Sequence, residues 1–364
     1  MSTAEADAVD VAVIGAGVVG CAIARALALS GRSVVLLERA ARPGLGVTAR
    51  SSGVVHSGLY YPPESLKARA CVRGNALLYE YCARRGVPWG KPGKLVVATE
   101  ATQLDGLEAL CDNARKAGAA GVTMIGGDAA RALEPAVPAL AALLCRETGQ
   151  VDAVALARAL CDDATRAGAL VLLACEVRGA AHDGQDFRLD TTRGEVAAER
   201  VVNAAGLFSD EVAALLGVPG HRIHPCRGDW FLLRTRTRVS HHVYPLRAAG
   251  SPGLGVHVTL GLDGSLRLGP DATWVTSRDD LAGGEDKAGR FLSAARALLG
   301  PLDDAELTHD GAGIRPKLRA PEERDERDFV LAEERPGLVN LVGIESPGLT
   351  AALDLADRVR ALIG

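Results

Sequence analysis

The sequence contains few aromatic residues and no long apolar run. Phe, Trp and Tyr make up 4% of its 364 residues. Because 48% of the residues are nevertheless hydrophobic, Ala, Val and Leu must form most of the core. No apolar stretch approaches the roughly 20 residues of a membrane-spanning helix. We therefore expect no integral membrane segment, although peripheral contact with a membrane is left open.

The chain also lacks a block of positive charge. Its formal net charge is −4, which argues against nucleic acid or an anionic membrane surface as a partner. Residues 1–9 are acidic and polar, unlike the Arg- or Lys-flanked start of a signal peptide. These absences favour a cytoplasmic protein that is at most loosely associated with the inner face of a membrane.

The cysteines show no metal-binding or disulfide pattern. No CxxC motif occurs, and no His/Cys cluster has the spacing of a metal site, so we expect no bound metal. The pattern predicts reduced, buried thiols in a cytosolic protein. The eight residues are Cys21, Cys71, Cys82, Cys111, Cys145, Cys161, Cys175 and Cys226.

The most informative stretch covers residues 9–40, VDVAVIGAGVVGCAIARALALSGRSVVLLERA. Residues 9–14 are rich in β-branched side chains, which predicts a buried parallel strand. Residues 18–30 then predict a helix, and residues 34–37 predict a second strand. Between the first strand and the helix stands a GxGxxG motif, which is weak evidence alone but specific in this strand–turn–helix context.

Each position in this motif has a physical function. Gly15 permits the tight strand-to-helix turn, and Gly17 lets the backbone approach a pyrophosphate. Gly20 lets the helix pack closely on the strand. Glu38, at the end of the second strand, can accept hydrogen bonds from a ribose hydroxyl pair and disfavours a 2′-phosphate. The stretch therefore predicts a site for FAD or NAD rather than NADP.

Three later segments favour flavin over NAD. Residues 170–180 predict a strand beside the one that ends at Glu38, with the backbone of Val177 near the adenine. Residues 199–217 predict a strand that ends in small residues, followed by a helix. Residues 337–362 predict a strand, a glycine-rich turn and a helix whose first N–H groups point at an anionic or carbonyl edge.

The chain resembles the D-amino-acid-oxidase-type FAD oxidoreductases and, within them, the L-2-hydroxyglutarate dehydrogenase/oxidase family. The resemblance rests on HSGLYYPPESLKARACVRGN, PGKLVVAT, LGVHVTLGLDGSLRLGPDA, GIRPKL and VNLVGIESPGLTAALDLA. It implies an α/β fold with a Rossmann-like FAD-binding domain of the glutathione-reductase type and an α+β, antiparallel-sheet substrate domain. It also implies FAD-dependent oxidation of an L-2-hydroxy acid, most simply L-2-hydroxyglutarate, with electrons passed to a quinone or to oxygen.

The predicted cofactor elements lie at the start, middle and end of the chain, so we expect interleaved domains. The FAD-binding domain is assigned residues 1–88, 145–219 and 310–364, and the substrate domain residues 89–144 and 220–309. Within the substrate domain we expect strands at 93–99, 227–234, 255–260 and 265–268, and helices at 101–117 and 285–299. The LDGS sequence before the last strand predicts a hairpin. The charged run at 322–328 is interpreted as a solvated loop.

The predicted contacts with the cofactor extend beyond the first motif. They are Gly15, Gly17, Val18, Val19, Gly20, Glu38, Arg39, Thr48, Ser51, Ser52, Gly53, Val177, Ala205, Gly206, Gly313, Arg315, Gly348, Leu349 and Thr350.

Oxidation of a hydroxy acid needs a base for the hydroxyl proton and a cation for the carboxylate. His56 suits the base, because an imidazole titrates near neutral pH, and the resemblance places it beside the isoalloxazine. Arg315 suits the carboxylate, because its guanidinium matches carboxylate geometry. His257 could contact substrate or flavin, or could equally be a core histidine.

Other candidates are weaker. Tyr60, Tyr61 and Tyr244 are interpreted as hydroxyl donors to the substrate or as packing residues. Lys317, Ser346 and Arg227 could also bind the substrate, with Arg227 on a distal carboxylate.

Two other functions stay open. The first is FAD-dependent oxidation of an amine or amino acid such as glycine, sarcosine or a D-amino acid. The second is a flavin-binding module without catalysis.

Overall fold

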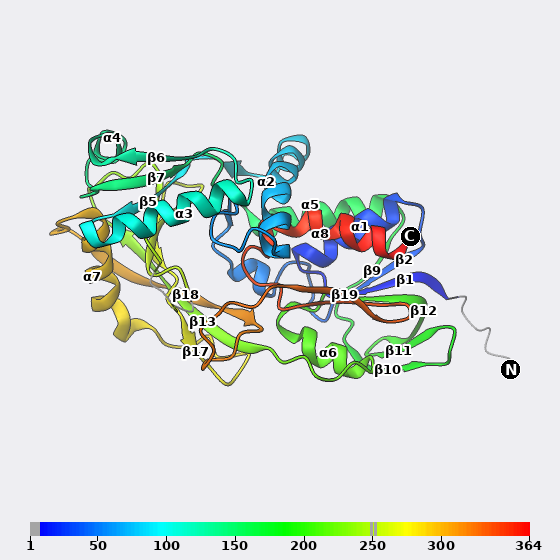
Figure 1. Ribbon diagram of the computed structural model, residues 1–364. Helices are drawn as coiled ribbons and strands as arrows, with labels where there is room; N and C mark the ends of the chain where they lie inside the picture. The colour runs from blue at the N-terminus through cyan, green and yellow to red at the C-terminus, as the bar shows by residue number, and fades with distance from the viewer. Residues whose placement is uncertain (1–7, 248–249, 251–252) are drawn as a thin grey trace, which may run out of the picture.

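The computed structural model describes residues 8–247, 250 and 253–364. Residues 1–7, part of the stretch that argued against a signal peptide, lie outside the described residues. Two bodies lie side by side, each built around one large sheet (Figure 1). Within the part of the chain that is described, no helix is both long and apolar enough to cross a membrane.

The first sheet has the order β10-β11-β12-β1-β2-β9, with β20 and β19 added beside β12. Its central strands run parallel, as the β-branched runs of the sequence predict. The strands are β1 (Val9–Ile14), β2 (Val34–Leu37), β9 (Leu170–Leu172), β10 (Val177–His182), β11 (Phe187–Thr191), β12 (Gly194–Asn203), β19 (Val330–Arg335) and β20 (Leu338–Val342).

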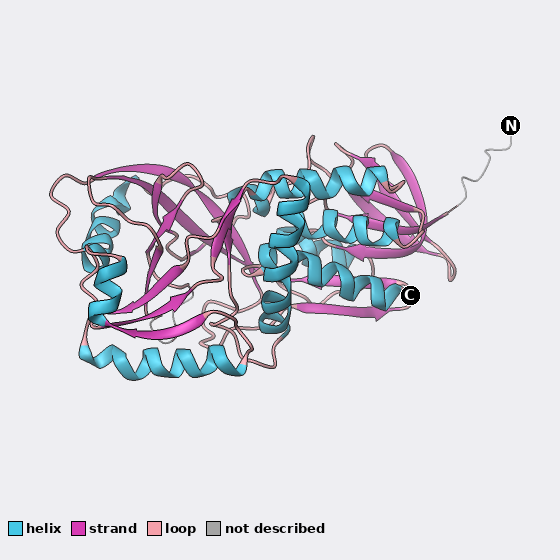
Figure 2. Ribbon diagram, turned by 90° about the horizontal axis from the view of Figure 1, so that it is seen from above, coloured by secondary structure: helices cyan, strands magenta, loops and turns pink. Residues whose placement is uncertain are grey.

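Helices from three distant parts of the sequence cover this sheet. α1 (Val18–Leu29) packs between α5 (Ala153–Arg166) and α8 (Gly348–Ile363), and α2 (Leu66–Arg85) crosses beside them (Figure 2). Small and branched side chains of α1 are buried in this contact, among them Ala22 and Ile23. The start, middle and end of the chain therefore form a single layer.

The second sheet has the order β17-β13-β16-β15-β14-β5-β7-β6, with β18 beside β13. All its pairings are antiparallel except β5 with β14. The strands are β5 (Lys94–Ala98), β6 (Val122–Gly126), β7 (Ala141–Cys145), β13 (His224–Arg234), β14 (His242–Pro245), β15 (His257–Leu260), β16 (Leu266–Gly269), β17 (Thr273–Trp274) and β18 (Glu306–Lys317).

Short elements complete the two bodies. A three-stranded sheet is formed by β3 (Val54–Val55), β8 (Gly149–Val151) and β4 (Trp89–Gly90). The remaining helices are α3 (Leu104–Lys116), α4 (Gly127–Leu133), α6 (Ser209–Leu215) and α7 (Ala288–Leu299).

The predicted fold class is confirmed, and the local elements match closely. The LDGS turn joins β15 to β16, with the N–H of Gly261 donating to the carbonyl of Ser265. The predicted helices at 101–117 and 285–299 each begin with a 3₁₀ turn. In the second sheet, β6, β7, β14 and β17 were not predicted, and the single strand predicted at 170–180 is divided into β9 and β10. β18 continues to Lys317, so a domain boundary at residue 310 would cut through a strand.

Candidate active site

A cavity of about 1120 Å³ lies between the two large sheets. Residues of β1 and β20 line one part of it, and residues of β13, β14, β15 and β18 line another. Ordinary small-molecule pockets occupy roughly 300–1,000 Å³. This cavity therefore has room for a ligand larger than a small metabolite.

The glycine-rich turn between β1 and α1 forms one end of the cavity. Gly15 has φ +103°, and a Cβ there would lie 2.6 Å from the carbonyl oxygen of Ala204. A Cβ on Gly20 would lie 1.8 Å from the carbonyl oxygen of Gly15. Both positions therefore require glycine, and the helix can begin close against the end of the sheet.

Two polar side chains fix the geometry of this turn. The carboxylate of Glu38 accepts hydrogen bonds from the N–H of Ala16 at 2.7 Å and of Ala40 at 2.8 Å. The hydroxyl of Thr48 accepts one from the N–H of Val18 at 3.1 Å. Glu38 thus stands at the carboxyl end of β2 and lines the cavity, as a ribose-binding acid requires.

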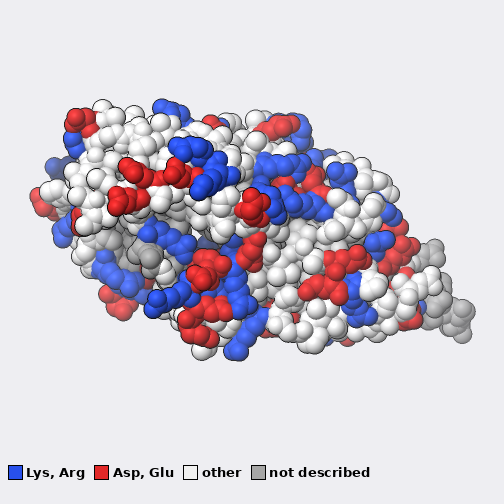
Figure 3. Space-filling model, in the orientation of Figure 1, with Lys and Arg blue, Asp and Glu red and all other residues white. Residues whose placement is uncertain are grey.

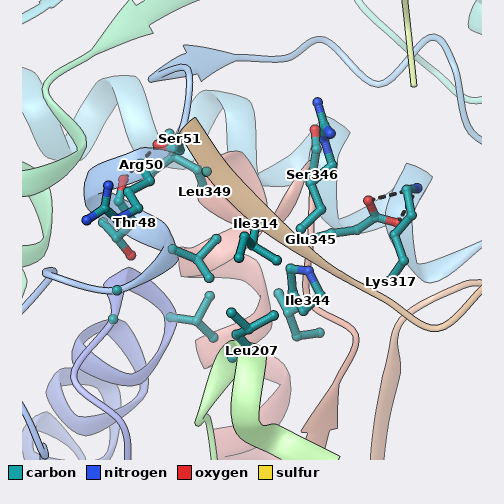
Figure 4. Close-up of a pocket in the computed structure, with 18 of the residues that line it drawn as sticks. Thr48, Arg50, Ser51, Leu207, Ile314, Lys317, Ile344, Glu345, Ser346 and Leu349 are labelled. Carbon is teal, nitrogen blue, oxygen red and sulfur yellow. Dashed lines mark hydrogen bonds and ion pairs between the residues drawn. The ribbon is translucent and has the colours of Figure 1, made fainter. Parts of the chain in front are cut away.

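Most of the predicted cofactor residues line this cavity, and Figure 4 shows Thr48, Arg50 and Ser51 on the side opposite Lys317. Those that line it are Gly15, Gly17, Val18, Val19, Glu38, Arg39, Thr48, Ser51, Ser52, Val177, Ala205, Gly206, Gly313, Arg315 and Leu349.

Four predicted residues, Gly20, Gly53, Gly348 and Thr350, stand behind the wall instead. A Cβ on Gly53 would lie 2.7 Å from the carbonyl oxygen of Val151, and one on Gly348 would lie 2.7 Å from the side chain of Ile344. The buried hydroxyl of Thr350 accepts a hydrogen bond from the N–H of His56. None of these four lines the cavity, and their contact with the cofactor stays a prediction.

His56 lies at the other end of the cavity and is 7% exposed. Its Nε2 is 3.2 Å from the hydroxyl of Ser346, and its carbonyl accepts a hydrogen bond from Asn75. Burial, followed by the nearby charge of Lys94, holds the pKa of His56 well below its usual range. The imidazole is therefore neutral near pH 7 and able to accept a proton.

Aromatic side chains form the wall beside His56. The rings of Tyr244 and His257 stack with centroids 3.7 Å apart, and Trp230 meets the same imidazole edge-on. The Nδ1 of His257 donates to the carbonyl of Gly255 at 2.8 Å, and burial lowers the pKa of His257 to about 3. The hydroxyl of Tyr60 has no hydrogen-bond partner among the described residues. The wall therefore consists of aromatic rings that carry hydroxyl and imidazole groups.

Arg315 projects from β18 into the same cavity. Its Nη2 donates to the carbonyl of Asp271 at 3.0 Å, while its buried Nη1 has no partner within the described residues. Gly228 on the paired strand β13 makes room, because a Cβ there would lie 2.8 Å from the Nη2 atom. One side of the guanidinium is thus fixed, and the other can bind a carboxylate.

Glu345 was missed in the sequence, although it directly precedes the predicted Ser346. The residue is 9% exposed, and its carboxylate lies 3.1 Å from the ammonium group of Lys67. It lies 3.1 Å from that of Lys317 as well (Figure 4). Burial raises the pKa of Glu345, but the positive charges of the two lysines have the larger combined effect and lower it to about 2. Lys317 lines the cavity as predicted, and its charge is partly neutralised there.

Arg227 does not line the cavity, and its role on a distal carboxylate stays a prediction. Its Nη1 donates to the carboxylate of Asp280 at 2.8 Å and to the carbonyl of Ala282 at 2.7 Å. These groups come from the loop after β17, which carries no recognisable sequence motif.

The charged run at 322–328 is a largely exposed loop, as predicted, and it also borders the cavity. Residues 324–328 line the cavity, and the carboxylate of Asp328 accepts hydrogen bonds from the first N–H groups of α2. Glu326 pairs with Lys317 and Arg247. On the face of the molecule shown in Figure 3, Asp and Glu side chains are interspersed with Lys and Arg.

Comparison with known proteins identifies the family. The sequence model of the family described as FAD dependent oxidoreductase matches residues 10–361. The chain is 35% identical to the mitochondrial L-2-hydroxyglutarate dehydrogenase of Arabidopsis thaliana, over 96% of this chain and 82% of that protein. It is 38% identical to the human enzyme, over 76% of this chain and 64% of that protein. The chain belongs to the FAD-dependent oxidoreductases and, within them, to the L-2-hydroxyglutarate dehydrogenases.

Solved structures agree on the fold. L-α-glycerophosphate oxidase of Mycoplasma pneumoniae, with FAD bound, superimposes with a TM-score of 0.88 and 24% identity, covering 98% of this chain and 95% of that one. Glycine oxidase of Geobacillus kaustophilus superimposes with a TM-score of 0.82 and 25% identity, covering 98% of this chain and 95% of that one.

FAD is therefore the cofactor of this oxidoreductase, and the cavity fits it. Gly15 and Gly17 of the glycine turn line the cavity, and Glu38 stands where the ribose would bind. When bound, FAD supplies an acceptor for a hydride, that is, two electrons and a proton. Among the described residues, no group of three or more His, Cys, Asp or Glu side chains is arranged to hold a metal ion.

Proposed function

We propose that this protein oxidises L-2-hydroxyglutarate to 2-oxoglutarate with FAD as the immediate hydride acceptor. The observation that carries the proposal is similarity to L-2-hydroxyglutarate dehydrogenases across 96% of the chain, at 35% identity. The cavity supports it, because a neutral buried histidine and a half-bound arginine face the same space.

The chemistry assigns one role to each of these groups. The Nε2 of His56 takes the hydroxyl proton as the Cα–H hydride leaves, so the proton and the electron pair go to different acceptors. Ser346, 3.2 Å from that nitrogen, orients the ring. The Nη1 of Arg315 holds a substrate carboxylate, and Tyr60, Tyr61 and Tyr244 exclude water around it.

The fate of the electrons is part of the proposal. We expect reduced flavin to pass them to a quinone or to oxygen, and dye-coupled turnover compared with oxygen uptake separates the two. A reducing, cytoplasmic location is supported by the cysteines, because all eight are free thiols and all except Cys111 are buried. Loose contact with a membrane would be tested by vesicle co-sedimentation.

The test of the reaction is anaerobic mixing of the FAD-loaded protein with single substrates. L-2-Hydroxyglutarate should bleach the flavin absorbance, whereas the D-enantiomer should not. Bleaching by glycine or sarcosine alone would instead establish amine oxidation. That second candidate is favoured by the similarity to glycine oxidase, at a TM-score of 0.82.

A further inference from the structure

Lys94, at the start of β5, is a fully buried lysine that the chemistry above does not use. It is 0% exposed, and its Nζ has no hydrogen-bond acceptor among the described residues. No carboxylate within the described part of the chain lies within ion-pair distance of it. Burying an ammonium without an acceptor or counter-ion is costly, so its presence calls for a function.

The ammonium stands directly behind the aromatic wall of the cavity. It lies 4.6 Å from the ring centroid of Tyr60 and 4.8 Å from that of Tyr244. Both rings line the cavity, and Tyr244 stacks on His257. The attraction between the cation and the two ring faces offsets part of the cost of burial.

The other groups around Lys94 carry no formal negative charge at neutral pH. The titratable side chains that face it, or face His56, from the surrounding loop and strands are His56, Tyr60, Cys71, Cys145, His242, Tyr244 and His257. Burial raises the pKa of Cys71 to about 12 and lowers the pKa of His242 to about 3, so both are neutral. Burial lowers the pKa of Lys94 itself, so a negative charge from a bound molecule would favour its ammonium form.

We propose that Lys94 is a positioning residue whose buried ammonium gives the wall of Tyr60, Tyr244 and His257 a positive potential. This potential attracts a carboxylate of the substrate and adds to the effect of burial on His56, which favours the neutral, proton-accepting imidazole. In a dry, low-dielectric site, a charge acts across one layer of side chains with little screening. The inference rests on the proposed function and deepens it, since it accounts for the choice of an anionic substrate.

The same potential acts against cationic ligands. An amine that enters as an ammonium ion would meet Lys94 across the tyrosine rings and be repelled. A hydroxydicarboxylate would be attracted. The position of Lys94 thus favours hydroxy-acid oxidation over amine oxidation on electrostatic grounds.

The test replaces Lys94 with methionine, which has a similar length and no charge. In FAD-loaded K94M, the Kd of 2-oxoglutarate, followed by the change in flavin absorbance, should rise on the order of tenfold. Removing the cation should raise the pKa of His56. As the pH is lowered, flavin reduction by L-2-hydroxyglutarate should therefore be lost at a higher pH in K94M than in the wild type. The melting temperature should not fall, because an unpaired buried charge is removed.

The matched control is K116M, which removes the same charge from the exposed end of α3. It should leave the Kd, the pH profile and the melting temperature unchanged. An unchanged Kd and pH profile in K94M would overturn the proposal. If K94M does not fold, K94Q is measured instead, and failure of both to fold would also overturn it, because the ammonium would then support the fold.

The failures of the two proposals can be told apart. If L-2-hydroxyglutarate does not reduce the wild-type flavin, the proposed reaction is wrong. The Kd of 2-oxoglutarate, which requires no turnover, still reports on Lys94.

Discussion

At the scale of single residues, the site depends on groups whose protonation is set by burial. His56 and His257 are both neutral near pH 7, because the interior disfavours imidazolium. Of the two, only His56 has a hydroxyl, that of Ser346, within hydrogen-bond distance of its Nε2. The Nδ1 of His257 is hydrogen-bonded to the carbonyl of Gly255, and this bond holds the ring in the aromatic wall.

Replacing His56 should remove the base. We expect His56→Ala to slow anaerobic flavin reduction by L-2-hydroxyglutarate by about 10²-fold or more, because no other group takes the hydroxyl proton. Stopped-flow absorbance measures this rate. His182→Ala, in the distant β10–β11 hairpin, should reduce at the wild-type rate. A near-normal rate in His56→Ala would exclude it as the base.

Replacing Arg315 should weaken carboxylate binding. Arg315→Lys keeps the charge but loses the planar fork, so we expect the Kd of 2-oxoglutarate to rise at least tenfold. Arg227→Lys is the matched control, because Arg227 is bound to Asp280 and Ala282 outside the cavity. Equal effects of the two substitutions would contradict the assignment of the carboxylate to Arg315.

At the scale of elements, Glu345 joins three of them. It follows β20 in the turn before α8, and its carboxylate binds Lys67 of α2 and Lys317 of β18. The pKa of this carboxyl is about 2 in the folded chain and about 4.3 in the unfolded chain. Its ionised form therefore favours the folded state above about pH 4.3, and this contribution is lost as pH falls through 2.

Glu345→Gln should destabilise the protein, because two buried lysines lose their shared partner. We expect the free energy of unfolding at pH 7 to fall by about 3 kcal/mol or more. The difference in the free energy of unfolding between the variant and the wild type should become smaller as the pH falls from 4 to 2. Denaturant unfolding at several pH values measures both effects. Glu64→Gln, whose side chain is 97% exposed, should change stability little.

Gly20→Ala should disrupt the cofactor turn, because the new Cβ would meet the carbonyl oxygen of Gly15. We expect the purified protein to bind FAD at least tenfold more weakly and to lose its yellow colour. Gly289→Ala, on the exposed face of α7 with nothing within 4 Å of a Cβ, is the control and should stay yellow. Full flavin content in Gly20→Ala would show that the turn can shift.

The elements were predictable wherever their signals are local. The β-branched run, the glycines and Glu38 fall within thirty residues, so the β1–α1–β2 unit could be predicted together with its ligand class. The run at 322–328 is the largely exposed loop that was predicted, but composition alone does not reveal that Asp328 caps α2. Lys94 and Glu345 were missed for the same reason, since their partners lie far away in sequence.

At the scale of the whole molecule, the function depends on two sheets that share one cavity. One sheet supplies the nucleotide turn, and the other supplies Arg315 and the aromatic wall. The helix layer of α1, α5 and α8 brings the start, middle and end of the chain together behind the first sheet (Figure 1). The aromatic wall of Tyr60, Tyr244 and His257 thus depends on contacts between residues that are distant in sequence.

The most direct measurement is a single-turnover experiment without oxygen. FAD-loaded protein is mixed with L-2-hydroxyglutarate, and 2-oxoglutarate is quantified against the flavin bleached. The account predicts one 2-oxoglutarate formed per flavin reduced, and none from the D-enantiomer, glycine or sarcosine. A flavin that stays oxidised with L-2-hydroxyglutarate, or that is reduced by an amine in its place, would contradict it.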